Sequence, residues 1–333
     1  MITNHHGARA LASLFTAIVA ILPTPAAAQP TVWKPSRNVE IIAPAGPGSA
    51  LDQTARALQK ILQEKRLVET AVAVANKPGG GQALGFTYLN QQPADGHHVS
   101  IGTISLITNR IIGLHPLYYG DVTPIANLVA EYVVFAVRSE SPLKSARELA
   151  DRLKKDPTAV SLSFSGSLGN HNHMAIGLVA KAAGADVRKL KTVVFNSGGE
   201  LGAALLGGHI DVAVGGSSVF MAHVQAGRMR LLAVTSPKRL GGLLADTPTW
   251  VELGLPASFA TFRGIVGPKD LAPAPLAQWE QLLRKVSDSD DWRAFLKAND
   301  AESLFLGSTD YRKFLDTENE RIRAILTDLG LAK

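Results

Sequence analysis

The chain has 333 residues, of which 46% are hydrophobic and 19% charged, a balance typical of a globular protein of about two domains. Its formal net charge of +6 comes from Lys and Arg spread along the chain without a basic run, which argues against nucleic-acid binding. The sequence contains no cysteine, which excludes disulfides, thiol catalysis and cysteine-ligated metals.

The first 28 residues have the pattern of a cleaved secretory signal. A basic start that includes Arg9 precedes the apolar run 10–22, which is followed by two prolines and the alanines 26–28. The apolar run is too short to span a bilayer. We therefore expect a mature chain that begins at Gln29 and lies outside the cytoplasm; the alternative is an N-terminal membrane anchor.

The next segment predicts an anion-binding corner. Residues 39–43 form a short apolar run typical of a buried strand, residues 45–49 are rich in Gly, Pro and Ser, and apolar residues follow at helical spacing from Ala50. A strand, a tight turn and a helix start direct backbone N–H groups into a cleft. The candidate ligand-binding residues here are Gly46, Pro47, Gly48, Ser49 and Asp52.

This corner does not fit a nucleotide site. It lacks the Gly-Lys-Ser/Thr of a phosphate-binding loop, and the third glycine of a dinucleotide fingerprint would fall at Leu51. The structural alternative is a plain tight turn that Asp52 holds through local hydrogen bonds.

The following segments extend a parallel sheet. We expect strands at residues 71–75 and 98–103, with a helix at 85–90 between them and a polar segment, 105–109, after the second. Ligands bind at the carboxyl ends of such strands. Ser105, in the loop after the third strand, is therefore a candidate ligand-binding residue.

A second strand–loop–helix corner follows at residues 161–183. A strand at 161–164 leads into a polar loop and a helix predicted at 174–183. There is no Gly-x-Ser-x-Gly elbow, so the serines are interpreted as hydroxyl donors to a ligand. The candidate ligand-binding residues of this loop are Ser165, Ser167, Leu168, Gly169, Asn170 and His171.

His171 and His173 could form half of a zinc site. Three or four ligands are needed, and no nearby carboxylate or histidine completes the set, so we predict no metal and favour loop or cap hydrogen bonding.

Two later loops complete the candidate site. A strand at 190–195 ends in Asn196, Ser197 and Gly198, and Asp211 precedes an apolar run. Asp211 could act as a base or bind ligand, although acceptance of backbone hydrogen bonds is the favoured interpretation. We expect the chain to cross between two domains near residues 129–133 and 233–237, so that two crossing strands form a hinge.

Eight runs of sequence resemble one family. From residue 39 to the end, the chain is similar to the periplasmic solute receptors of tripartite tricarboxylate transporters, the Bordetella uptake family. The matching runs are 44–52, 76–81, Asp95-Gly96, 118–126, Ser165-Gly166 with His173, 207–211, 232–236 and 246–254.

The resemblance implies an α/β, type II periplasmic-binding-protein fold, with two domains, a two-strand hinge and a ligand cleft between them. Residues 29–130 and 237–333 would form domain 1, and residues 131–236 domain 2. The implied function is that of a monomeric periplasmic receptor, without cofactor or catalysis. It would bind a di- or tricarboxylate or an aromatic carboxylate and deliver it to the permease subunits in the membrane.

The same resemblance implies binding by water and backbone amides rather than by an Arg clamp. Departures from the family pattern at Ala45, Ser49, Leu51 and residues 195–197 concern the identity of the ligand. Leu51, Leu168 and Phe195 could line an apolar wall for an aromatic or longer aliphatic acid. Two other functions stay open: a hydrolase or metal enzyme that uses Ser167 or the two histidines, and a receptor that feeds a sensor protein.

Overall fold

The computed structural model describes residues 1–3 and 33–333, and the chain from Trp33 to Lys333 forms one compact unit. The predicted signal segment lies almost entirely outside the described residues. Among the residues described, no helix is both long and apolar enough to cross a membrane.

The first sheet forms as its sequence pattern predicts. Strand β1 (Val39–Ala43) lies between β2 (Val72–Asn76) and β3 (His98–Thr103), parallel to both. Helices α1 (Ala50–Glu64) and α2 (Ala83–Asn90) connect these strands, and α3 (Ser105–Ile111) follows β3. The segment predicted as a polar loop after β3 is therefore a short helix, and its residues 106–109 are buried.

One long strand belongs to two sheets. The first part of β4 (Thr123–Arg138) pairs antiparallel with β9 (Ala260–Gly267) and β10 (Glu302–Gly307), which joins it to the first sheet. From Val133 onward β4 pairs instead with β7 (Val212–Gly216) and β8 (Met229–Val234). The change of partners falls between Tyr132 and Val133, within the predicted first crossing.

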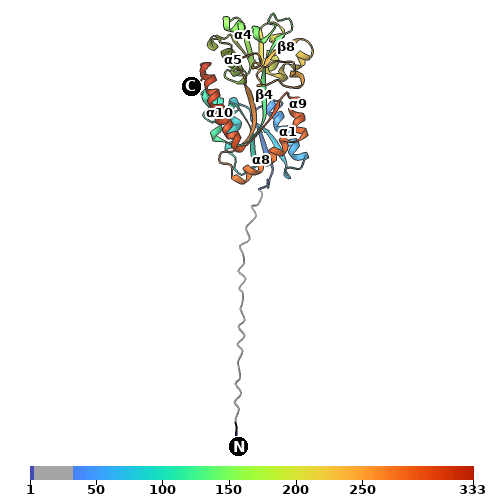
Figure 1. The fold of residues 1–333 in the computed structure, drawn as a ribbon, viewed down its shortest axis with the longest axis vertical. Coiled ribbons are helices and arrows are strands. Elements are labelled where there is room, and N and C mark those ends of the chain that lie inside the picture. The colour runs from blue at the N-terminus through green and yellow to red at the C-terminus, as the bar shows by residue number, and fades with distance from the viewer. Residues whose placement is uncertain (4–32) are drawn as a thin grey trace. The chain divides into compact units, whose positions relative to one another are not determined.

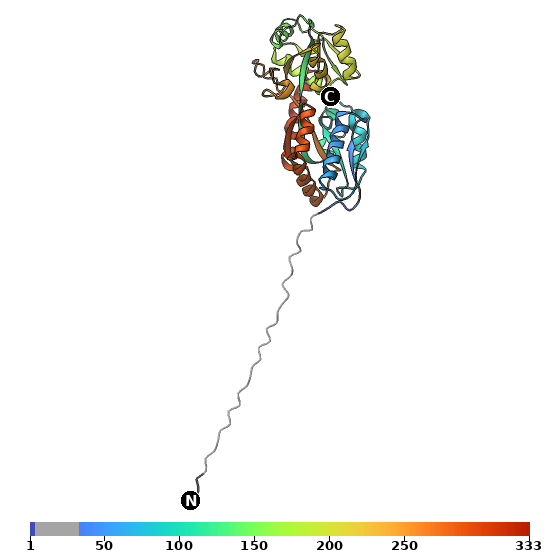
Figure 2. The same cartoon turned by 90° about the vertical axis from the view of Figure 1, so that its right-hand side faces the viewer.

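The second sheet repeats the strand–loop–helix pattern. Its other strands are β5 (Leu162–Ser165) and β6 (Thr192–Phe195), and β5 lies parallel between β6 and β7. The helices of this part are α4 (Ala146–Lys155), α5 (His171–Ala182), α6 (Gly198–Leu206) and α7 (Met221–Gln225). In Figures 1 and 2, α4, α5 and β8 lie in one lobe and α1 and α8 in the other, with β4 running through both.

The C-terminal part contacts both lobes. Helices α8 (Pro273–Ser287) and α9 (Asp290–Ala298) cover the first sheet, whereas α10 (Ser308–Asp328) extends from β10 toward α5. Asp328 pairs with Lys181 of α5 at 2.6 Å, and the backbone N–H of Lys333 donates to Ile111 of α3 at 2.9 Å. The chain end therefore ties α3 and α5 together.

The expected α/β class, with two packed α/β lobes, is confirmed. Trp279 and Trp292 are buried in the core between α8, α9 and the first sheet, and Phe135 and Trp250 pack edge to face beside the second, with ring centroids 5.0 Å apart. The domain limits given above stay a prediction.

Candidate ligand-binding site

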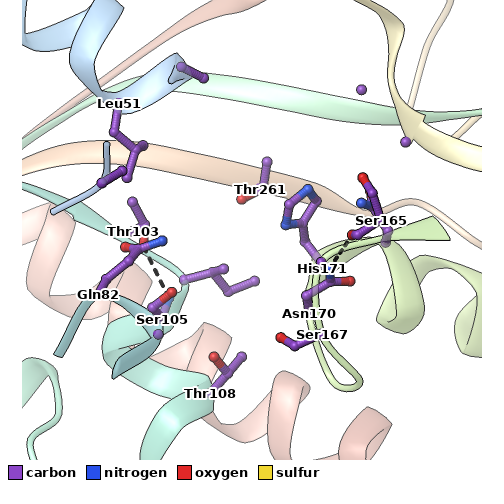
Figure 3. A pocket seen from close by; sticks show the side chains of 18 of the residues that line it. Leu51, Gln82, Thr103, Ser105, Thr108, Ser165, Ser167, Asn170, His171 and Thr261 are labelled. Carbon is purple, nitrogen blue, oxygen red and sulfur yellow. Dashed lines mark hydrogen bonds between the residues drawn. The ribbon is translucent and has the colours of Figure 1, made fainter. Parts of the chain in front are cut away.

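A cavity of about 550 Å³ lies where the loops after the strands of both sheets meet. Figure 3 shows Gln82, Thr103 and Ser105 on one side of it, facing Ser165, Asn170 and His171 on the other. Eleven of the residues predicted from sequence line this cavity: Ser49, Ser105, Ser165, Ser167, Leu168, Gly169, Asn170, His171, Asn196, Ser197 and Gly198. The structure therefore brings together loops more than 100 residues apart in the chain.

The first corner is built around a buried carboxylate. Ser49 is the N-cap of α1, and its Oγ accepts from the backbone N–H of Asp52 at 3.3 Å. Asp52 accepts in turn from the N–H of Gly48 at 2.8 Å, from Asn76 Nδ2 at 3.0 Å and from Arg56 Nε at 2.9 Å. These donors, Arg56 first, lower the pKa of Asp52 to about 2.

Asp52 therefore holds the turn in place, as the structural alternative predicted. Gly48 has φ +78°, a left-handed conformation that favours glycine. Of the predicted residues of this corner, Ser49 lines the cavity. The others, Gly46, Pro47, Gly48 and Asp52, do not line it.

The second corner is held by Asn170 and His173. Asn170 caps α5 by accepting from the N–H of His173 at 3.0 Å, and its Nδ2 donates to the carbonyl of Ser165 at 2.8 Å. The helix therefore begins at His171, three residues before the predicted start at Met174, because the capping signal lies within the polar loop.

His173 is buried behind this loop. Its Nδ1 accepts from the backbone N–H of Gly169 at 3.0 Å, and its ring stacks on Phe164 with centroids 5.0 Å apart. Burial lowers the pKa of His173 to about 4, so its imidazole is neutral at pH 7. Its position fits the predicted loop hydrogen bonding.

His171, by contrast, lines the cavity, as Figure 3 shows. Burial lowers the pKa of its imidazole, and the positive charge of Arg263 acts in the same direction while Glu131 opposes it. No group of three or more His, Asp or Glu side chains suited to hold a metal ion is found among the described residues.

The remaining predicted residues divide into two groups. Ser197 caps α6 by accepting from the N–H of Glu200 at 3.2 Å, and it lines the cavity together with Asn196 and Gly198. Asp211 does not line the cavity; it accepts from the backbone N–H and the hydroxyl of Ser161, each at 2.8 Å, at the start of β7. Its contacts match the favoured structural interpretation.

The expected apolar wall is present only in part. Leu51 and Leu168 line the cavity, but Phe195 does not.

Sequence reasoning missed a charged pair in the cavity wall. Glu131 of β4 and Arg263 of β9 form an ion pair, and Arg263 Nη1 donates to Thr54 Oγ1 of α1 at 2.9 Å. Both charged residues line the cavity. Glu131 is the single charge between Thr123 and Val137, and such an interruption of an apolar strand was the available signal.

Further uncharged polar residues of the lining were also missed, among them Gln82, Thr103 and Asn172. Thr103 Oγ1 donates to Gln82 Oε1 at 2.6 Å and accepts from the N–H of Ser105 at 3.2 Å. Asn172 is 5% exposed, and its Oδ1 has no hydrogen-bond partner within the described part of the chain. All three contribute to a lining rich in neutral hydrogen-bonding groups.

Two α/β lobes joined through a shared strand, with a polar cavity at the carboxyl ends of their strands, define the class of periplasmic solute-binding proteins. The comparisons with known proteins identify the family. The model of the tripartite tricarboxylate transporter family receptors matches residues 54–331, and the chain belongs to this family, as the sequence motifs predicted.

Curated relatives extend over almost the whole chain. A UPF0065 protein of Cupriavidus necator is 26% identical over 99% of this chain and 98% of its own length. BugT of Bordetella pertussis is 23% identical over 89% of this chain and 90% of its own.

Solved structures show the same fold. A TctC solute-binding protein from Polaromonas, determined without ligand, has a TM-score of 0.75 at 23% identity, over 89% of this chain and 99% of that one. The periplasmic binding protein BugD has a TM-score of 0.72 at 22% identity, over 90% and 99%. Among the solved neighbours, BugD is a periplasmic binding protein and another is a periplasmic transporter.

Proposed function

We propose that this protein is an extracytoplasmic receptor that binds an organic carboxylate in the cavity and delivers it to the permease subunits of a tripartite tricarboxylate-type transporter. The observation that carries the proposal is the convergence of three helix starts, those of α1, α5 and α6, on one polar cavity. The first residues of these helices provide backbone N–H groups and partial positive charge.

The uncharged hydrogen-bond donors of the lining are suited to bind a carboxylate. The hydroxyls of Ser105 and Ser167 line the cavity and make no hydrogen bond within the described residues, so they are free to donate to a carboxylate. A carboxylate held by hydroxyls and amides requires no second buried charge, whose desolvation would oppose binding. The proposed binding residues are therefore those of the predicted set that line the cavity.

Two related structures give a precedent for the ligand class. The R. palustris protein Rpa4515 was determined with adipate and MatC with malate, at 23% and 19% identity to this chain. Both ligands are carboxylates, which supports the class of ligand proposed here.

Closure of the two lobes would couple binding to transport. We propose that the first crossing lies at Tyr132 and Val133, because β4 changes its pairing partners there. For the second, we propose a position near Phe259 rather than the predicted 233–237. Trp250 packs on Phe135, and the N–H of Phe259 still donates to Thr235 at 2.8 Å, so these residues remain with the second sheet.

The test is binding of carboxylates to the exported protein, stripped of bound ligand by unfolding and refolding. Each acid is compared with its uncharged amide in thermal unfolding. A ligand at 100 times its Kd stabilises the native state by about 2.7 kcal/mol, a shift of several degrees. Stabilisation by an acid and not by its amide supports the proposal, and a flat panel contradicts it.

The alternatives give different outcomes in the same preparation. Recovery of the acid unchanged after long incubation supports a receptor, whereas turnover that depends on Ser167 or His171 supports an enzyme. Capture of the liganded protein by permease subunits supports delivery to a transporter, and capture by a sensor protein contradicts it. The N-terminal sequence of the exported protein tests the proposed cleavage before Gln29.

A further inference from the structure

We propose that the ligand carries one carboxylate joined to an apolar body, an aliphatic chain or an aromatic ring, and that Glu131 excludes a second carboxylate. This inference rests on the proposed function and narrows its ligand class. It comes from the charges of the cavity wall and from the apolar side chains that share the cavity.

The cavity lining contains one negative and one positive side chain, whose charges cancel. Among the described residues of the lining, Glu131 and Arg263 are the only Asp, Glu, Lys or Arg. Their side chains are 18% and 5% exposed, and they form an ion pair. Arg263 Nη1 also donates to Thr54, so both terminal nitrogens of its guanidinium already make a hydrogen bond within the described residues.

Within this neutral pair, the carboxylate of Glu131 is the group that carries the negative charge. Its Oε2 accepts from Arg263, and its Oε1 lies beside Gly216, where an added Cβ would be only 2.9 Å away. Glu131 thus extends from β4 toward the last residue of β7. A second carboxylate on the ligand would face this like charge, and the cation of the lining, Arg263, already pairs with Glu131.

Apolar side chains line another part of the same cavity. Leu114 follows α3 and Leu168 belongs to the loop before α5, and they are 56% and 50% exposed. Ile112 joins these two segments, since a Cβ added at Gly169 would lie 3.4 Å from its Cγ2. Leu51, from the first turn of α1, also lines the cavity.

These leucines are exposed at the place where a ligand would bind. An apolar body that covers Leu114 and Leu168 removes apolar surface from water, which favours binding. A short di- or tricarboxylate would place solvated charge beside the same side chains. The charges of the cavity wall and the exposed leucines therefore both favour a monocarboxylate with an apolar body.

The experiment compares acids of equal length by titration calorimetry on the exported protein, after removal of bound ligand. The pairs are hexanoate with adipate and benzoate with terephthalate. We expect the monocarboxylate of at least one pair to bind at least about tenfold more tightly, which corresponds to about 1.4 kcal/mol. Equal or tighter binding of both dicarboxylates overturns the inference and leaves the receptor proposal intact. Binding of no acid contradicts the receptor proposal itself.

Substitutions at Glu131 and Leu168 test the charge of the cavity wall and its apolar surface separately. Glu131→Gln removes the repelling charge and frees Arg263, so adipate binding should strengthen by about tenfold while hexanoate changes little. Glu302→Gln is the matched control, because Glu302 accepts from Tyr132 at 3.1 Å and does not line the cavity. An unchanged preference in Glu131→Gln overturns the role of Glu131.

A second variant avoids the buried pair. Leu168→Ser changes a half-exposed side chain, so the fold should persist. It should weaken hexanoate binding severalfold and leave acetate unaffected, since acetate has no chain to cover Leu168. Equal effects on both acids would overturn the apolar part of the inference.

Discussion

Arg263 and Glu131 form a diagonal ion pair across two neighbouring strands. Arg263 of β9 lies opposite Val129 of β4, whereas Glu131 lies opposite Thr261. The guanidinium also reaches Thr54 of α1 at 2.9 Å. A single side chain thus connects the first helix, β9 and β4 just before β4 enters the second sheet.

Removal of one partner of this pair should be costly. Arg263→Gln leaves Glu131 without its partner in a largely buried position, and we expect a loss of about 3 kcal/mol in the free energy of unfolding. Glu131→Gln combined with Arg263→Gln should cost less than the sum of the single changes, because neither charge is then left alone. Urea unfolding of the two single variants and the double variant measures this coupling.

Arg239→Gln provides the control, since Arg239 pairs with Glu252 at 2.9 Å on the surface and is half exposed. We expect this change to cost less than about 1 kcal/mol. Additive losses in the double variant of Glu131 and Arg263 would contradict a coupled pair.

Substitution of two cavity serines, Ser49 and Ser105, should distinguish the effect of helix capping on stability from the effect of a hydroxyl on ligand binding. Ser49→Ala removes the cap of α1 and should lower stability by about 1 kcal/mol as well as weaken binding. Ser105→Ala leaves the helix caps intact and should weaken binding alone. Unfolding and calorimetry with the best acid of the panel measure both quantities. A Ser105→Ala variant with unchanged affinity would remove Ser105 from the proposed site.

The carboxylate of Asp52 should stabilise the first turn only when it is ionised. Because its pKa is lowered to about 2 from the usual 3.8, its contribution is complete above pH 3.8 and is lost as the pH falls toward 2. Asp52→Asn should therefore cost about 2 kcal/mol at pH 7 and less at pH 2.5. Denaturant unfolding at the two pH values measures the difference.

Asp310→Asn is the control for this change. Asp310 is exposed, and its one ion pair within the described residues is with Lys313 at 3.4 Å, so its loss should be nearly neutral at both pH values. A cost for Asp52→Asn that does not depend on pH would show that size or shape, rather than charge, holds the turn.

Local signals in the sequence predicted the two corners because short segments form them. The turn before α1 depends on Gly48, Ser49 and Asp52, all within five residues, and the interpretation of Asp52 as a turn-holding group agrees with its contacts. The start of α5 was placed three residues late, since a polar run such as 170–173 resembles a loop although Asn170 caps a helix there.

Local sequence signals do not predict contacts between residues that are far apart in the chain. Glu131 and Arg263 are 132 residues apart, and nothing near either residue indicates the other. Strand β10 was missed as well: its residues are only partly buried, and its pairing with β4 spans more than 170 residues. Pairing partners of this kind are set by the tertiary fold and not by local propensity.

His173 should make the stability of the protein depend on pH. Its folded-state pKa of about 4 lies below the usual 6.5, so the unfolded chain takes up the proton first. The contribution of His173 is complete above pH 6.5 and falls between pH 6.5 and 4, and the linkage predicts that His173 alone loses about 2 kcal/mol at pH 5. Urea unfolding of the ligand-free protein at pH 7.5 and pH 5 measures the total loss, to which His171 adds because burial lowers its pKa as well.

His173→Gln keeps a polar side chain next to Gly169 but does not titrate, so it should reduce the pH-dependent loss by about 2 kcal/mol, whatever its effect at pH 7.5. His209→Gln, at an exposed position, is the matched control and should retain the wild-type dependence. If His173→Gln loses as much stability between pH 7.5 and pH 5 as the wild type, another group carries the proton uptake. In that case the buried contact between His173 and Gly169 fixes the loop without linking it to pH.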